Sequence, residues 1–174
     1  MSPTEFADDF DAPGLDTEVW VPHYLPQWSS RAQSAATYEV AGSELRLTIP
    51  PDQGLWCAED HQEPLRVSGV QSGVYSGEVG STVGQQPFRD GQVVRERQAT
   101  QWGWTPQYGV LEVRARMVLS PRSMASVGWS GSRTSRRAAA RSASSRSSAT
   151  PSRSTAAVPP RRSAWACTRS AIPR

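Results

Sequence analysis

The sequence predicts an all-β sandwich, on three observations. Short segments rich in β-branched and aromatic residues alternate between apolar and polar side chains. Glycine and proline turns separate these segments at fairly regular spacing, as they do between short strands. No segment up to Val118 shows the 3.6-residue periodicity of a helix. At 174 residues, the chain is long enough for one domain with a sizeable core.

The first thirty residues predict loops that carry aromatic side chains. Residues 6–20 are acidic and rich in turn formers, and their aspartates could bind calcium or cap turns, although the Gly and Glu of an EF-hand loop are missing. Residues 21–31 are aromatic, prolyl and irregular. Tyr24, Trp28 and Arg31 could stack on and clamp a sugar there, or the two rings could simply be buried.

The next segments predict a hairpin, a loop and a further strand. Residues 37–40 and 43–49 flank a turn at Ala41 and Gly42, and the second segment alternates until two prolines end it. In the loop 52–64, Cys57 and His61 could be metal ligands, but a second paired motif is missing, so we predict no metal site. Residues 65–77 are β-prone, and their glycines suggest bulges or close backbone approach.

Residues 102–118 contain the clearest alternation in the chain. A short polar strand over residues 93–98 leads into this segment, which begins with Trp102 and Trp104. One side of the strand is expected to face the core and the other to carry Tyr108 and charged groups. The polar side could line a groove for a polar ligand or could simply be solvated. The residues expected to face inward are Gly109, Leu111, Val113, Ala115 and Met117.

Two of these motifs resemble the N-terminal half of glycoside hydrolase family 16. The motifs are residues 66–73 (RVSGVQSG) and residues 108–116 (YGVLEVRAR), with Leu111 standing where the family usually has an aromatic. The resemblance covers about residues 5–126 and implies a β-jelly roll that is incomplete in this chain. It further implies action on β-glucan polysaccharides, as in β-glucanases and laminarinases. The candidate substrate-binding residues are Tyr24, Trp28, Arg31, Trp102, Trp104 and Tyr108.

The catalytic residues that the resemblance implies are absent. Enzymes of this family retain the anomeric configuration and use two glutamates, whose carboxyl groups lie ~5–5.5 Å apart. Both glutamates come from one strand a few dozen residues beyond the position of Glu112, in a Glu-hydrophobic-Asp-hydrophobic-(x)-Glu run, where x is an extra residue that some members have. All 16 acidic residues of this chain lie at or before Glu112. We therefore assign no catalytic residue and expect the chain to be an inactive, truncated form.

The charge distribution divides the chain near residue 126. Residues 1–126 hold nine arginines and all 16 carboxylates, a net charge of −7, whereas residues 127–174 hold ten arginines and no carboxylate, a net charge of +10. We predict two regions, a partial jelly roll over 1–126 and a disordered tail rich in Arg, Ser and Ala over 127–174. A basic arm of this kind could bind nucleic acid non-specifically.

A frameshift near Val127 is the other interpretation of the tail. With one choice of synonymous codons, residues 140–150 read one base out of frame give GEICIFEIFGD, which has the glutamate spacing of the family with Cys in place of Asp. Residues 129–134 give MVGLED and residues 164–173 give GVGMHAIRDP at the same offset. The tail then needs no function of its own, which makes a nucleic-acid partner the weaker hypothesis.

The remaining expectations concern class, partners and location. A non-catalytic carbohydrate-binding module is the main rival to an inactive hydrolase, with Trp56 as a further stacking ring. We expect no cofactor and no membrane partner, and the sequence does not indicate an oligomeric state. The N-terminus shows no signal peptide and no apolar run has transmembrane length, so the default location is cytoplasmic. A parent enzyme of the family could be secreted.

Overall fold

The computed structural model describes residues 5–106, 108–132 and 161–171. Strands and irregular loops dominate this part of the chain, in which the only helical segments are one turn of 3-10 helix, η1 (Pro26–Trp28), and one short helix, α1 (Arg31–Ser34). The predicted all-β class is therefore confirmed, while the jelly-roll arrangement stays a prediction. In these residues, no helix is long and apolar enough to cross a membrane.

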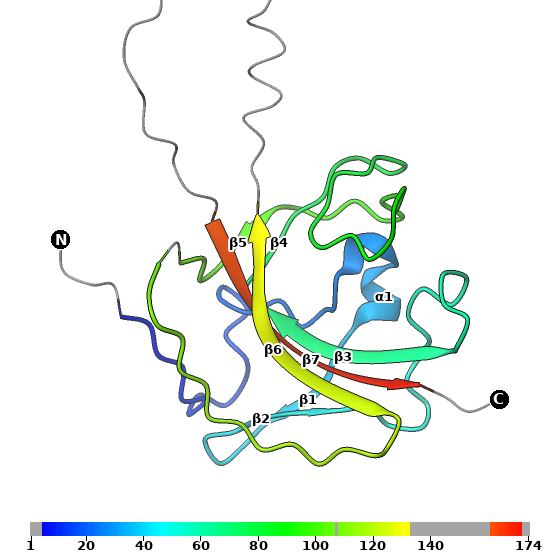
Figure 1. Ribbon diagram of the computed structural model, residues 1–174. Helices are drawn as coiled ribbons and strands as arrows, with labels where there is room; N and C mark the ends of the chain where they lie inside the picture. Colours follow the sequence, from blue (N-terminus) through cyan, green and yellow to red (C-terminus); the bar gives the residue numbers. More distant parts are fainter. Residues whose placement is uncertain (1–4, 107, 133–160, 172–174) are drawn as a thin grey trace, which may run out of the picture.

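The predicted hairpin forms where its alternation and turn place it. β1 (Thr37–Val40) pairs antiparallel with β2 (Leu45–Thr48), and Val40 lies opposite Leu45 next to the turn. Gly42 and Ser43 take positive φ angles of 60° and 58° in that turn, a conformation that glycine adopts at no steric cost. The hairpin lies against the larger sheet, where β1 contacts β3 and β2 contacts both β3 and β7 (Figure 1).

The larger sheet has three strands in the order β3-β7-β6 (Figure 1). β3 (Leu65–Gln71) confirms the predicted third strand, and its residues from Val67 to Gln71 are buried. β7 (Arg161–Ala171) lies between β3 and β6 (Ser123–Ser132) and pairs antiparallel with both. After β3, the chain forms β4 (Gly73–Val74), which pairs with β5 (Gln101–Trp102) in a separate two-stranded ladder.

Parts of the predicted tail lie in strands, while the division of the chain at residue 126 stays a prediction. β6 crosses the predicted boundary at residue 126 without a break, and residues 161–171 form β7. Serine, alanine and arginine are weak strand formers, but their backbone groups can join a ladder whenever a neighbouring strand offers partners. Residues 133–160 lie outside the described residues. The recovered glutamate run, at residues 140–150, and most of the expected disorder fall in this segment.

The segment with the clearest alternation is not a strand. Residues 108–118 adopt no regular structure, and among the described residues they share no backbone ladder with another segment. Val110 and Val118 are 95% and 93% exposed, and of the five residues expected to face inward only Leu111 is even half-buried. A strand is stabilised by hydrogen bonds to a neighbouring strand, and an alternating sequence does not by itself provide that neighbour. The prediction of a strand here is therefore wrong, as is the prediction over residues 93–98.

Candidate functional site

Tyr24 and Trp28, two of the predicted sugar-stacking residues, lie in the hydrophobic core. Trp28 is 0% exposed, and its Nε1 donates a hydrogen bond of 2.7 Å to the carbonyl oxygen of Gln85. The ring of Tyr24 packs edge-on against buried Trp56, with ring centroids 5.1 Å apart. A ring that protein atoms cover cannot present a face to a sugar, so these three aromatics are corrected to core residues. The core cluster comprises Tyr24, Leu25, Trp28, Trp56, Cys57, Val67 and Val94.

Trp102 and Trp104 lie at a different place, on either side of a tightly packed glycine. The Gly103 nitrogen donates to the carbonyl oxygen of Ser72 at 3.1 Å. A Cβ at Gly103 would overlap the carbonyl oxygen of Val19 and lie 2.8 Å from the Val19 Cα. The backbone between the two tryptophans is thus locked against the N-terminal loop, which fixes both rings relative to the fold.

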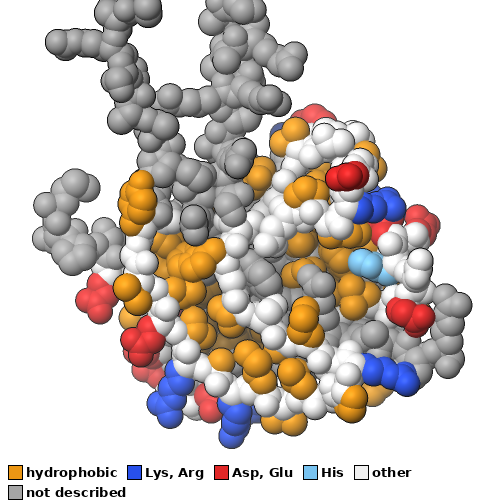
Figure 2. Space-filling model, viewed as in Figure 1, with side chains coloured by type: hydrophobic (Ala, Val, Ile, Leu, Met, Phe, Trp, Pro, Cys, Tyr) orange, Lys and Arg blue, Asp and Glu red, His pale blue; other side chains and the backbone are white. Residues whose placement is uncertain are grey.

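Both tryptophans are half-buried because other aromatic rings pack against them. Trp102 lies 5.6 Å from the ring of Tyr75, whose pKa is raised by burial. Trp104 stacks on Phe6 at 4.8 Å with an interplanar angle of 22°, and it contacts Trp129 of β6 at 5.6 Å. Hydrophobic side chains also gather in broad patches on the face shown in Figure 2, with charged groups mainly around its rim. The partly exposed rings can contribute apolar contact area, but much of their surface already serves packing.

The last two predicted site residues are exposed and are held differently. The backbone nitrogen of Arg31 donates to Glu96 Oε1 at 3.1 Å, and the side-chain Nη1 of Arg31 donates to Gln98 Oε1 at 3.2 Å. Tyr108 is exposed at the start of the unpaired segment 108–118. The six predicted residues therefore divide between the core, the Gly103 region and two exposed positions. No shared element or contact joins all six residues into one site.

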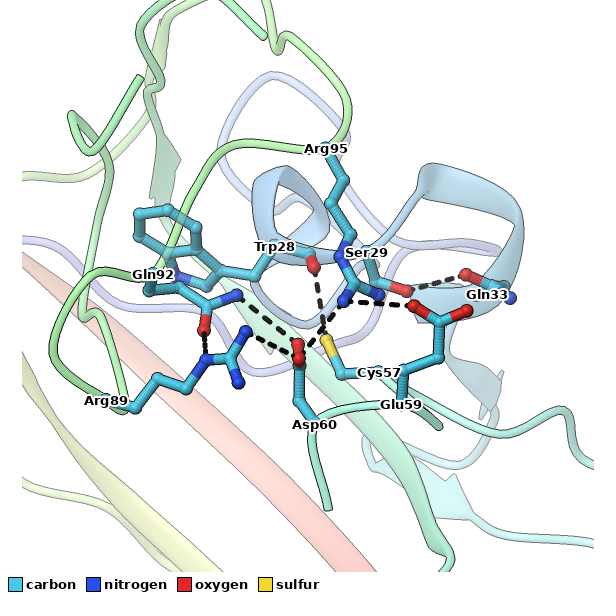
Figure 3. Close-up of polar contacts among 9 residues, drawn as sticks. All are labelled: Trp28, Ser29, Gln33, Cys57, Glu59, Asp60, Arg89, Gln92 and Arg95. Carbon is cyan, nitrogen blue, oxygen red and sulfur yellow. Dashed lines mark hydrogen bonds and ion pairs between the residues drawn. The ribbon is translucent and has the colours of Figure 1, made fainter. Parts of the chain in front are cut away.

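A buried carboxylate that sequence analysis missed forms the densest polar cluster (Figure 3). The Asp60 side chain is 2% exposed and accepts from Arg89 Nη2 at 2.7 Å and Arg95 Nη2 at 3.1 Å. Arg95 also pairs with Glu59 at 3.5 Å, and Gln92 Nε2 approaches Asp60 Oδ2 at 3.5 Å. Because Asp60 follows the core residues Trp56 and Cys57 by only a few positions, this cluster ties the 88–95 loop to the core. No sequence pattern marked these partners, which come from loops about thirty residues apart.

Replacing Asp60 by asparagine is expected to destabilise the fold by about 2 kcal/mol. The change leaves two arginines without their shared anion, but both are partly exposed, so water reduces the loss below the ~3–5 kcal/mol of a fully buried pair. Urea denaturation followed by circular dichroism measures the effect. Asp90→Asn is the matched control, because Asp90 is exposed. Equal stability of the two variants would mean that the cluster does not hold the loop.

The titratable groups near the core do not form a metal or nucleophile site. Burial raises the pKa of the Cys57 thiol to about 12, and its Sγ donates to the carbonyl oxygen of Trp28 at 3.2 Å. Burial has the opposite effect on His23, whose pKa it lowers because it disfavours the charged imidazolium. The Nδ1 of His23 lies 3.0 Å from the Arg31 carbonyl oxygen. A thiol kept neutral at physiological pH is a poor ligand and a poor nucleophile. Across the described ranges, no group of three or more His, Cys, Asp or Glu side chains could hold a metal ion.

Comparison with known proteins gives a partial likeness to a solved structure. No protein-family model matches the chain, and no curated protein matches it. Among solved structures, the chain is similar to the GlcNAcα1-4Gal releasing endo-β-galactosidase from Clostridium perfringens, with 28% sequence identity and a TM-score of 0.45. The match covers 60% of this chain and 24% of the enzyme, so the chain spans about a quarter of the length of that protein.

Proposed function

We propose that the chain is the N-terminal part of a family 16-like β-glucan hydrolase that has lost its catalytic strand and does not cleave polysaccharide. The observation that carries this proposal is the position of Glu112. It lies inside the motif YGVLEVRAR, which resembles the strand preceding the catalytic strand of that family, and it is the last carboxylate of the chain. The motif that introduces the catalytic machinery is therefore present, and the machinery is not.

The chemistry explains why this loss abolishes turnover. A retaining hydrolase needs one carboxylate to attack the anomeric carbon and a second carboxyl group to protonate the leaving oxygen. Two such groups reach the same sugar when they lie on one face of a strand, either at alternate positions or five residues apart where a bulge inserts one extra residue. Beyond Glu112, the chain offers only serine, threonine, cysteine, arginine and aromatic side chains at polar positions. None of them can replace both carboxylates in this mechanism.

A single-base frameshift near Val127 accounts for the loss. The net charge is −7 over residues 1–126 and +10 over residues 127–174. With one choice of synonymous codons, residues 140–150 read one base out of frame contain two glutamates in the pattern of the family. The exposed segment 108–118 agrees with this account. Its alternation suits a paired strand, yet among the described residues it has no partner strand, as expected where the neighbouring strand was never translated.

The purified chain is expected to release no reducing sugar from laminarin or lichenan above the buffer background, because no nucleophile or acid/base pair is present. The matched control is a gene with one base restored in the codons around Val127, whose product we expect to cleave at least one of these glucans. Glutamine at either recovered glutamate should then abolish that cleavage. Turnover by the unaltered chain, or an inactive but folded restored product, would overturn the proposal.

A further inference from the structure

β6 leaves one long edge of the three-stranded sheet open. Its inner edge pairs with β7 along all ten residues, from Ser123 opposite Ser170 to Ser132 opposite Arg161. Because the strand order is β3-β7-β6, β6 is the end strand, and no described segment pairs with its outer edge (Figure 1). The backbone groups on this outer edge are available to another strand.

The opposite edge of the same sheet is covered. On β3, Gln71 exchanges two backbone hydrogen bonds with Val21, of 2.7 and 3.0 Å. Gln53 Nε2 donates to the Val67 carbonyl oxygen at 3.0 Å, and the Trp56 nitrogen donates to the Leu65 carbonyl oxygen at 2.8 Å. Groups from loops thus bond the outer edge of β3 at Leu65, Val67 and Gln71. The sheet can accept one additional strand, on the β6 side.

The composition of β6 favours pairing with an identical strand. Its sequence, SMASVGWSGS, contains no charged residue and no proline, which are the usual means of protecting an edge. When a strand pairs antiparallel with its own copy, residues near the two-fold axis lie next to their own counterparts, so a charged residue there meets a like charge, which is destabilising. β6 has none, and Met124 and Val127 are exposed apolar side chains that can pack across the new pairing.

We propose that β6 of one chain pairs antiparallel with β6 of a second copy, so that two three-stranded sheets join across a two-fold axis. Antiparallel pairing of identical edges is self-complementary, and each sheet has one open edge, so association ends at the dimer. The occupant of the edge is the second copy rather than the exposed segment 108–118 of the same chain, because that segment carries Glu112, Arg114 and Arg116 and lies unpaired despite its proximity in sequence. This pairing does not depend on the proposal that the chain derives from a hydrolase.

Sedimentation equilibrium of the full chain tests this pairing. We expect a species of twice the 19.0 kDa monomer mass, and we expect Val127→Lys to halve that mass by placing like charges near each other at the new pairing. Val79→Lys is the matched control, since Val79 is 65% exposed in a loop, and it is expected to remain dimeric. Met124→Lys provides a second edge variant if Val127→Lys does not fold.

Each other outcome overturns the proposal. A monomeric unaltered chain at about 100 µM, roughly a hundredfold above a dissociation constant of 1 µM, would show that the edge is not used for a dimer of ordinary affinity. A dimer that survives both folded lysine variants would place the interface elsewhere. Open-ended aggregation of the unaltered chain would contradict a closed two-fold pairing. A monomer in which the amides of β6 resist hydrogen exchange on both edges would mean that the chain covers its own edge.

Discussion

Trp28→Ala is expected to lower the free energy of unfolding by about 3–5 kcal/mol, a large part of the stability of a domain. Trp28 is fully buried, and removing a buried tryptophan side chain costs about 3–5 kcal/mol, compared with a total stability of roughly 5–15 kcal/mol for a domain. The variant also removes the hydrogen bond from Nε1 to the Gln85 carbonyl oxygen. The ring is tightly enclosed, because Gly84 lies so close to it that a Cβ there would be 2.6 Å from Trp28.

Urea denaturation of Trp28→Ala measures this loss, with Trp104→Ala as the matched control. Trp104 is half-buried, so the same truncation should cost distinctly less at that position. The comparison separates a core role from a ligand-binding role. Two results together would contradict the assignment of Trp28 to the core. Trp28→Ala would have to fold with unchanged stability, and a glucan oligomer would have to change the fluorescence of the unaltered chain but not that of the variant.

Gly103→Ala is expected to destabilise the fold by about 3 kcal/mol, at the upper end of typical overpacking costs. The new methyl group would meet the backbone of Val19 rather than a flexible side chain, so relief requires the N-terminal loop or β5 to move. Either movement displaces Trp102 and Trp104. We therefore expect a change in tryptophan emission at low denaturant, in addition to an earlier unfolding midpoint.

Gly54→Ala is the control for Gly103→Ala. No atom lies within 4 Å of a Cβ at Gly54, and this glycine does not have a positive φ angle, so alanine should be neutral or slightly stabilising through the unfolded state. A destabilisation of equal size in both variants would mean that the close approach of Gly103 to Val19 does not limit this region.

The site could be predicted less well than the strands. Sequence reasoning singled out aromatic residues as sugar-stacking groups, but Tyr24 and Trp28 became core because other buried side chains enclose them. It missed Asp60, whose importance comes from two arginines on a distant loop. The type of a side chain limits what it can do, whereas its neighbours decide whether it is covered, paired or exposed.

Local sequence alone determined the β1–β2 hairpin and β3, because alternation, β-branched residues and the turn at Gly42 act over a few neighbouring positions. It also determined the division of charge and the absence of carboxylates after Glu112. Only the tertiary structure decided that residues 108–118 remain unpaired, although they alternate better than any other segment. It likewise decided that β6 and β7 form from sequence with little strand preference. The physical reason is the same in both cases: a strand is stabilised by hydrogen bonds to a neighbour, and the neighbour lies far away in the chain.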